Sequence, residues 1–138
     1  MNPFEKLQET QSVLCMYPWA EGVSVTNWFP PIGLECIAAA IESIGIHTRT
    51  VDMRFETDPA MLTAFPAEAV CISVNWDDQI PILPHLLQYL KTDQCIIVGG
   101  RAATFNTEEI FDDCPQVDVI FRGDGERTIG EIFSKRPL

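Results

Sequence analysis

Three short runs of uncharged, mostly apolar residues constrain the fold of this chain most strongly. They cover residues 12–17, 69–74 and 95–98. A continuous apolar run of this length is typical of a strand that is covered on both faces, as strands in parallel sheets are. Two further segments, residues 47–53 and 117–121, are rich in β-branched side chains or alternate in polarity. The sequence therefore predicts five buried or half-buried strands.

Helical patterns separate these strands. Leu34, Ile37, Ile41 and Ile44 recur at intervals of three and four after a Pro-Pro pair, which predicts a helix over residues 31–44 that ends at Gly45. Weaker patterns predict helices at 58–65, at 81–90 with Asp77 or Asp78 as a possible cap, from Asn106 with Glu109 as a capping box, and at 126–134. Pro81 and Pro84 favour a late start for the helix at 81–90.

The alternation of strand and helix predicts the fold class. It favours an α/β domain with a five-stranded, doubly wound parallel sheet of the flavodoxin-like or Rossmann-like type. We place this domain at residues 12–134. We expect residues 1–11 to be disordered and residues 135–138 to form a tail.

The charge balance excludes some partners. Nine basic and twenty acidic residues give a formal net charge of −11, which disfavours binding to nucleic acid or to anionic lipid. No apolar run is long enough to cross a bilayer, and the first residues lack the pattern of a signal peptide. We expect a cytoplasmic protein without a membrane span.

The cysteines and histidines show no metal-binding pattern. The five cysteines contain no CxxC spacing, and His47 and His85 are far apart. We expect free thiols packed as small apolar side chains. No metal ligand and no catalytic residue is predicted in this chain.

The loops after the strands are the candidate binding region, because ligands of doubly wound sheets bind beyond the carboxyl ends of the strands. Trp19, Trp28 and Trp76 fall in these loops. These tryptophans predict either an aromatic wall for a large ligand or side chains that simply plug the end of the sheet.

Gly99-Gly100 directly after a strand indicates a close backbone approach or a positive φ. Gly123-x-Gly125 lacks a third glycine, since Thr128 stands there, so a dinucleotide fingerprint is not supported.

Several motifs follow one another in a characteristic order. The most informative are PPIGL at residues 30–34, VGGRAAT at 98–104 and RGDGE at 122–126. Their order and spacing resemble the N-terminal cobalamin-binding domain of cobalamin-dependent radical SAM proteins. That group includes the anaerobic magnesium-protoporphyrin IX monomethyl ester cyclase type and radical SAM methyltransferases. The resemblance extends over about residues 12–134.

The resemblance implies a place for each part of cobalamin. The corrin ring would lie over the carboxyl ends of the strands, with the loop of residues 19–22 under the cobalt. Ser73, Val74, Asn75 and Trp76 would lie beside the nucleotide tail. Gly99 and Gly100 would leave room for the dimethylbenzimidazole base. The implied cofactor-binding set is Trp19, Ser73, Val74, Asn75, Trp76, Gly99, Gly100, Arg101, Gly123, Asp124, Gly125 and Glu126.

The sequence departs from related cobalamin proteins in three ways. The Asp-x-His-x-x-Gly loop is absent after the first strand, which implies base-off cobalamin without a histidine ligand to cobalt. Ser73-x-Asn75 also lacks the leucine or threonine of the usual Ser-x-Leu pattern. The radical SAM barrel and its CxxxCxxC motif are missing, so S-adenosylmethionine and an iron–sulfur cluster would belong to a partner domain in cis or in trans. We expect no catalysis by this chain alone.

Two other functions stay open. A degenerate module could bind no cofactor and dock another domain through its tryptophans. A flavodoxin or receiver function is less supported. The first strand has no phosphate-binding loop after it, and Ser73-Val74-Asn75 supplies no acceptor aspartate.

Overall fold

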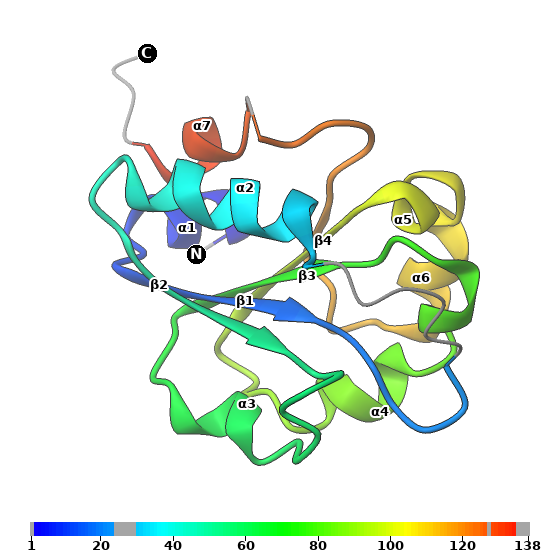
Figure 1. Cartoon of the computed structure of the whole chain (residues 1–138). Coiled ribbons are helices and arrows are strands. Elements are labelled where there is room, and N and C mark those ends of the chain that lie inside the picture. Colours follow the sequence, from blue (N-terminus) through cyan, green and yellow to red (C-terminus); the bar gives the residue numbers. More distant parts are fainter. Residues whose placement is uncertain (1, 24–29, 127, 135–138) are drawn as a thin grey trace.

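A computed structural model describes residues 2–23, 30–126 and 128–134 (Figure 1). Its sheet has five strands in the order β2-β1-β3-β4-β5, and every neighbouring pair is parallel. This confirms the predicted doubly wound α/β fold. The strands are β1 (Ser12–Tyr17), β2 (His47–Asp52), β3 (Ala69–Ser73), β4 (Cys95–Gly99) and β5 (Val119–Ile120).

Helices cover both faces of the sheet. The upper layer in Figure 1 holds α1 (Pro3–Gln8), α2 (Ile32–Glu42) and α7 (Ile129–Phe133). The lower layer holds α3 (Met61–Ala64), α4 (Leu83–Leu87) and α6 (Thr107–Asp113). Two short helices, η1 (Asp77–Gln79) and α5 (Arg101–Phe105), follow β3 and β4 at the carboxyl edge of the sheet.

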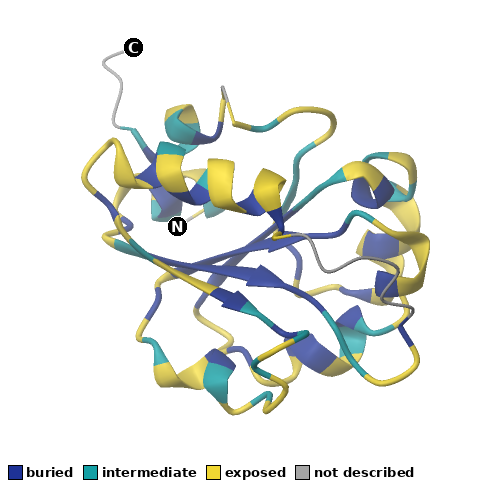
Figure 2. Cartoon of the chain, viewed as in Figure 1, coloured by how far each residue is buried: buried dark blue, intermediate teal, exposed yellow. Residues whose placement is uncertain are grey.

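Alternation along the central strands creates two cores. In β1, Leu14 and Met16 face the lower core while Val13 and Cys15 face the upper core. The same period of two continues through β3 and β4, because successive side chains of a strand point to opposite faces. Both faces are thereby buried (Figure 2), which explains the continuous apolar runs in the sequence.

The N-terminal segment differs from the expectation of disorder. Asn2 caps α1 by accepting a hydrogen bond from the Glu5 amide at 2.9 Å, and the Glu5 side chain accepts a bond from the Asn2 amide. Leu7 is fully buried in the upper core with Phe133 of α7. Phe4 and Leu7 are too few apolar residues to give a clear periodic signal in this polar segment, so local patterning does not predict the burial of Leu7.

Two predicted helix caps are not formed. Asp77 and Asp78 lie within η1, whose N-cap position is Trp76. Asn106 donates its side-chain amide to the Ala102 carbonyl oxygen at 2.8 Å instead of capping α6. Asn106 bonds in this way because of α5, a helix that was not predicted. It occupies residues that sequence patterning assigns to a loop.

The five cysteines are free thiols, and four of them are buried. Cys36 is the exception and is exposed on α2. Burial, followed by the charge of Asp118, raises the pKa of Cys95 to about 12. Within the described residues, no helix is long and apolar enough to cross a membrane.

Candidate functional site

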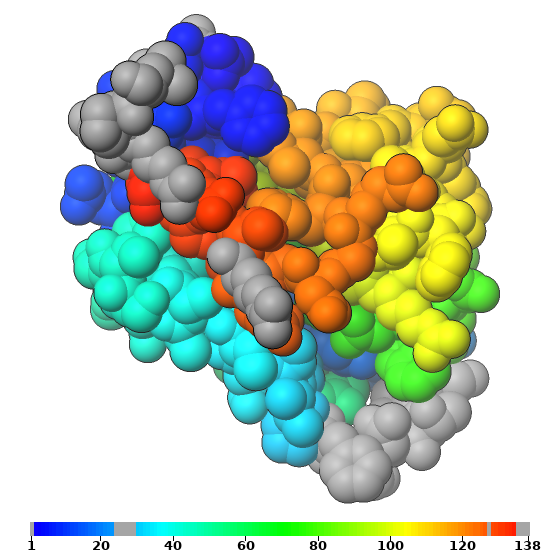
Figure 3. All heavy atoms as spheres, turned by 90° about the horizontal axis from the view of Figure 1, so that it is seen from above, coloured from blue at the N-terminus to red at the C-terminus, as the bar shows by residue number. Residues whose placement is uncertain are grey.

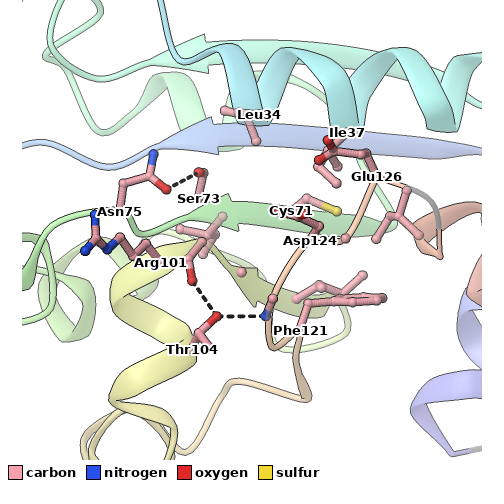
Figure 4. Close-up of a pocket in the computed structure, with 18 of the residues that line it drawn as sticks. Leu34, Ile37, Cys71, Ser73, Asn75, Arg101, Thr104, Phe121, Asp124 and Glu126 are labelled. Carbon is pink, nitrogen blue, oxygen red and sulfur yellow. Dashed lines mark hydrogen bonds between the residues drawn. The ribbon is translucent and has the colours of Figure 1, made fainter.

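A cavity of about 500 Å³ opens at the carboxyl edge of the sheet. Figure 3 shows it as a hollow between α2, the segment after β5 and α5. Residues of β3 and β4 form its floor, α2 and α5 lie on either side, and residues 121–126 close one end and approach Ile37 of α2 (Figure 4). A cavity of this size is in the range of small-molecule sites. Its lining comprises Gly33, Leu34, Ile37, Cys71, Ile72, Ser73, Asn75, Ile97, Gly99, Gly100, Arg101, Thr104, Phe105, Phe121, Gly123, Asp124, Gly125, Glu126 and Ile129.

Thr104 holds the two sides of one wall together. Its hydroxyl donates to the Gly100 carbonyl oxygen at 3.0 Å and accepts from the Gly123 amide at 2.9 Å. Gly123 has a φ of +80°, which lets the chain turn back toward α2 after β5. Thr104 therefore fixes the distance between α5 and the segment after β5.

Gly100 is required by the packing of the chain against itself. Its φ is +107°, and a Cβ there would lie 2.5 Å from the Val74 carbonyl oxygen. That oxygen accepts hydrogen bonds from the amides of Ala102 and Ala103, at 3.0 and 3.3 Å. The prediction that both glycines leave room for a ligand needs correction at Gly100, since the close neighbour is the backbone after β3. At Gly99, a Cβ would meet only Phe121 Cβ, at an ordinary 3.6 Å.

Ser73 is a buried hydroxyl in the cavity floor, with only 8% of its surface exposed. Its Oγ lies 3.4 Å from Asn75 Oδ1, which is long for a hydrogen bond between oxygens. The hydroxyl therefore keeps capacity to bind a polar atom of a ligand in the cavity.

The charged residues of the lining lie at its exposed margin. Arg101, Asp124 and Glu126 line the cavity from two different walls, as Figure 4 shows, and Arg101 and Asp124 are largely open to solvent. Among the described residues, Arg101 is the one basic side chain of this lining. The mouth thus carries both signs of charge, while the floor is largely apolar.

Nine of the predicted site residues line this cavity, and three do not. Val74 is fully buried in the lower core, and its carbonyl group binds α5. Trp19 packs against the same lower core, so it plugs the end of the sheet. Trp76 is 47% exposed. Trp28 lies outside the described residues, so the expected row of three tryptophans is not seen as a single wall.

Several lining residues were not predicted as site residues. The sequence pattern is that of ordinary core positions at Leu34, Ile37, Phe121 and Ile129. Hydrophobic periodicity cannot distinguish a side chain that faces a cavity from one that faces a neighbouring element. Thr104 lies inside the VGGRAAT motif, and membership of that motif could have identified it as a site residue.

Gln79, also unpredicted, joins the loops after β1 and β3 beneath this edge. It is 1% exposed. Its Oε1 accepts from the amides of Asn75 and Trp76, at 2.9 and 3.1 Å, and its Nε2 donates to the Pro18 carbonyl oxygen at 2.8 Å. One side chain thus satisfies three backbone groups in two loops.

Replacing Gln79 with alanine is expected to destabilise the protein by about 2–4 kcal/mol, because it leaves these backbone groups without partners. Gln94→Ala is a matched control at the opposite edge of the sheet. Gln94 is also buried and accepts from the Lys91 amide and donates to the Ala67 carbonyl oxygen, both at 2.8 Å. Urea unfolding should give similar losses for both variants. A Gln79→Ala midpoint equal to that of the unsubstituted protein would contradict the prediction.

The described residues contain no cluster of three or more metal-ligating side chains. His47 contacts Phe65 and His85 contacts Tyr89, and neither histidine lines the described cavity. Cys71 does line it. A hydrogen bond with Cys15, together with burial, raises the pKa of Cys71 well above its usual value, so this thiol stays neutral.

Comparison with known families assigns the fold. The family model of the B12 binding domain matches residues 19–133, which is most of the chain. The chain belongs to the B12-binding domain family. The resemblance noted from the motifs is therefore confirmed at the level of the family. No match to this B12-binding domain was found among curated proteins.

Two solved structures share the fold. The cobalamin-dependent S-adenosylmethionine radical enzyme OxsB, with aqua-cobalamin and S-adenosylmethionine bound, superposes with a TM-score of 0.67 at 16% identity. The match covers 94% of this chain and 19% of OxsB, so this chain spans about a fifth of that enzyme's length. A CheY-like receiver domain from Methylobacillus flagellatus gives a TM-score of 0.54 at 16% identity, covering 88% of this chain and 98% of the receiver.

Proposed function

We propose that this B12-binding domain holds cobalamin in a base-off form, with the nucleotide tail in the cavity and the corrin ring over the carboxyl edge of the sheet. The observation that carries the proposal is the cavity itself. It is an open, mostly apolar space at the edge where doubly wound sheets bind ligands, with the Ser73 hydroxyl in its floor.

The residues present fit such a group. Leu34, Ile37 and Phe121 offer apolar contacts to an aromatic base, and Ser73 offers one hydrogen bond to a ring nitrogen. Arg101 would face the phosphodiester of the tail and offset the charges of Asp124 and Glu126. Gly99 would allow the base to approach the end of β4. Gly100, Gly123 and Gly125 would shape the surrounding backbone.

The remaining predicted residues would act at the corrin. Trp19, packed on the lower core, would support the loop of residues 19–22, and that loop would lie under the cobalt face. Trp76 would contact the margin of the ring. Asn75 and Val74 would hold the loop between the ring and the tail. When bound, cobalamin supplies a cobalt centre that can carry a methyl group or take part in redox chemistry. This chain would contribute position and an axial environment without a histidine.

We propose that the domain serves a radical SAM methyltransferase or oxidative cyclase. S-Adenosylmethionine and the iron–sulfur cluster would be bound by a radical SAM domain in cis or in trans, and the protein would act in the cytoplasm. The motif order and the similarity of the fold to that of OxsB support this assignment. We further propose that residues 12–134 form one domain.

A docking module without a cofactor is a second candidate. Ile32, Trp76 and Phe105 are large apolar residues that are 63%, 47% and 78% exposed. They follow β1, β3 and β4 and so lie in the connections at the carboxyl edge. Exposed apolar side chains of this kind are typical of interaction surfaces. The two candidates differ in whether the isolated chain retains a corrinoid.

A binding experiment tests the proposal. The protein is mixed with hydroxocobalamin, free ligand is removed by gel filtration, and cobalt content and the visible spectrum are measured. We expect stoichiometric cobalt with the spectrum of the base-off form. A base-on spectrum would contradict the placement of the tail. If no cobalt is retained, by this chain or by a longer chain that includes a radical SAM domain, the cobalamin function is wrong and the docking module is favoured.

A further inference from the structure

Three backbone polar groups around the cavity are already hydrogen-bonded to the chain. The Gly99 carbonyl oxygen accepts from the Val74 amide at 2.7 Å. The Gly100 carbonyl oxygen accepts from both the amide and the hydroxyl of Thr104, each at 3.0 Å. The Gly123 amide donates to Thr104 Oγ1. These three groups are therefore already engaged within the chain.

The described side chains of the inner wall are apolar apart from Ser73, its neighbour Asn75, and Thr104, whose hydroxyl is already bonded to Gly100 and Gly123. Leu34, Ile37, Ile97, Phe121 and Ile129 line this part of the cavity. The Cys71 thiol is neutral, and its hydrogen bond with Cys15 is internal to the sheet. The Ser73 hydroxyl is buried and lies 3.4 Å from Asn75 Oδ1, a long contact that leaves both side chains able to bind a ligand.

Charged side chains do not change this inner surface. Arg101, Asp124 and Glu126 lie at the margin. A group that enters the cavity fully leaves water and exchanges it for apolar contacts, the Ser73 hydroxyl and the Asn75 amide. Each polar atom beyond those that these two side chains can bind then costs free energy, since the apolar side chains of the wall cannot replace its lost hydrogen bonds to water.

We propose that this cavity selects the chemical class of the nucleotide base in the corrinoid, taking benzimidazoles and rejecting purines. A displaced benzimidazole presents one acceptor nitrogen, which Ser73 can satisfy, and a hydrocarbon edge for the apolar wall. A displaced adenine presents further ring nitrogens and an amino group. The inference rests on the proposed cobalamin function and adds a specificity to it.

The test compares three corrinoids in equilibrium dialysis against the protein. They are cobalamin, its analogue with adenine as the base, and cobinamide, which has no nucleotide. All are used in excess cyanide, so that cyanide occupies both axial positions of cobalt. The bases are then displaced from cobalt in every ligand, and the comparison does not include the cost of releasing them.

We expect cobalamin to bind about 10- to 100-fold more tightly than the adenine analogue. Ser73→Ala should weaken cobalamin binding by about tenfold and leave cobinamide binding unchanged. Ser43→Ala, at an exposed position at the end of α2, serves as the matched control and should change neither affinity.

The outcomes separate this inference from the function on which it rests. Equal affinity for the two bases overturns the selection. Cobinamide binding as tight as cobalamin binding also overturns it, because the tail then gains nothing from the cavity. If none of the three corrinoids binds to this chain or to a longer chain that includes a radical SAM domain, the cobalamin function itself fails.

Discussion

Gly100→Ala is expected to destabilise the protein by about 3 kcal/mol or more, enough to remove much of the stability of a small domain. The native φ of +107° disfavours any side chain, and the added Cβ would lie 2.5 Å from the Val74 carbonyl oxygen and 2.8 Å from Asn75 Oδ1. Relief requires α5 to move away from β3, which would break the bonds from the Ala102 and Ala103 amides to Val74.

Urea unfolding monitored by circular dichroism measures this loss. Gly130→Ala is the control, because Gly130 lies within α7, has no positive φ, and a Cβ there would meet no neighbouring part of the fold within 4 Å. Alanine there should be neutral or stabilising by up to about 1 kcal/mol. Equal midpoints for the two variants would show that the contact at Gly100 can relax without cost. Because Gly100 supports the fold, its replacement by a large residue cannot test ligand binding.

Gly33→Phe should prevent cobalamin from placing its tail in the cavity. Gly33 lines the cavity one helical turn before Ile37, which also lines it, and a Cβ at Gly33 would meet no neighbouring part of the fold within 4 Å. The position therefore accepts a Cβ, and an aromatic ring built on it would compete with a ligand for the space that Gly33 lines. An aromatic base buries on the order of 150 Å², or about 4 kcal/mol, so cobalamin affinity should fall by about two to three orders of magnitude.

The matched control is Ala39→Phe, which adds the same ring to an exposed position of the same helix outside the cavity. Dialysis against cobalamin and cobinamide measures both variants. Gly33→Phe should lose the advantage of cobalamin over cobinamide, and Ala39→Phe should keep it. A Gly33→Phe variant that binds cobalamin as tightly as the unsubstituted protein would place the tail elsewhere.

The strands and their burial could be predicted from the sequence, because the relevant signal is local. The apolar runs that became β3 and β4 are best accommodated in a sheet covered on both faces. The spacing of Leu34, Ile37 and Ile41 likewise predicted α2 to within two residues at each end. The order of these elements was enough to predict the parallel topology, which the structure confirms.

The helix boundaries near the site were less predictable because distant residues decide them. Asn106 resembles a cap for α6, but the presence of α5 places the Ala102 carbonyl oxygen within reach of its side chain. Asp77 and Asp78 resemble caps, but the loop is held by Gln79 and its bond to Pro18. In both cases the hydrogen-bond partner in the folded protein is a residue that local sequence patterning does not reveal.

The residues of the site also fall into two groups, those that the sequence predicted and those that only tertiary packing placed. The motifs alone placed Ser73, Gly99, Arg101 and the segment 123–126 at one edge of a sheet, because parallel strands all end at the same side. Tertiary packing decided the rest. It turned Trp19 into the lower core, assigned Gly100 to a contact with Val74, and enclosed the cavity with Ile37 and Phe121. These outcomes depend on distances between separate elements, and hydrophobic periodicity does not encode such distances.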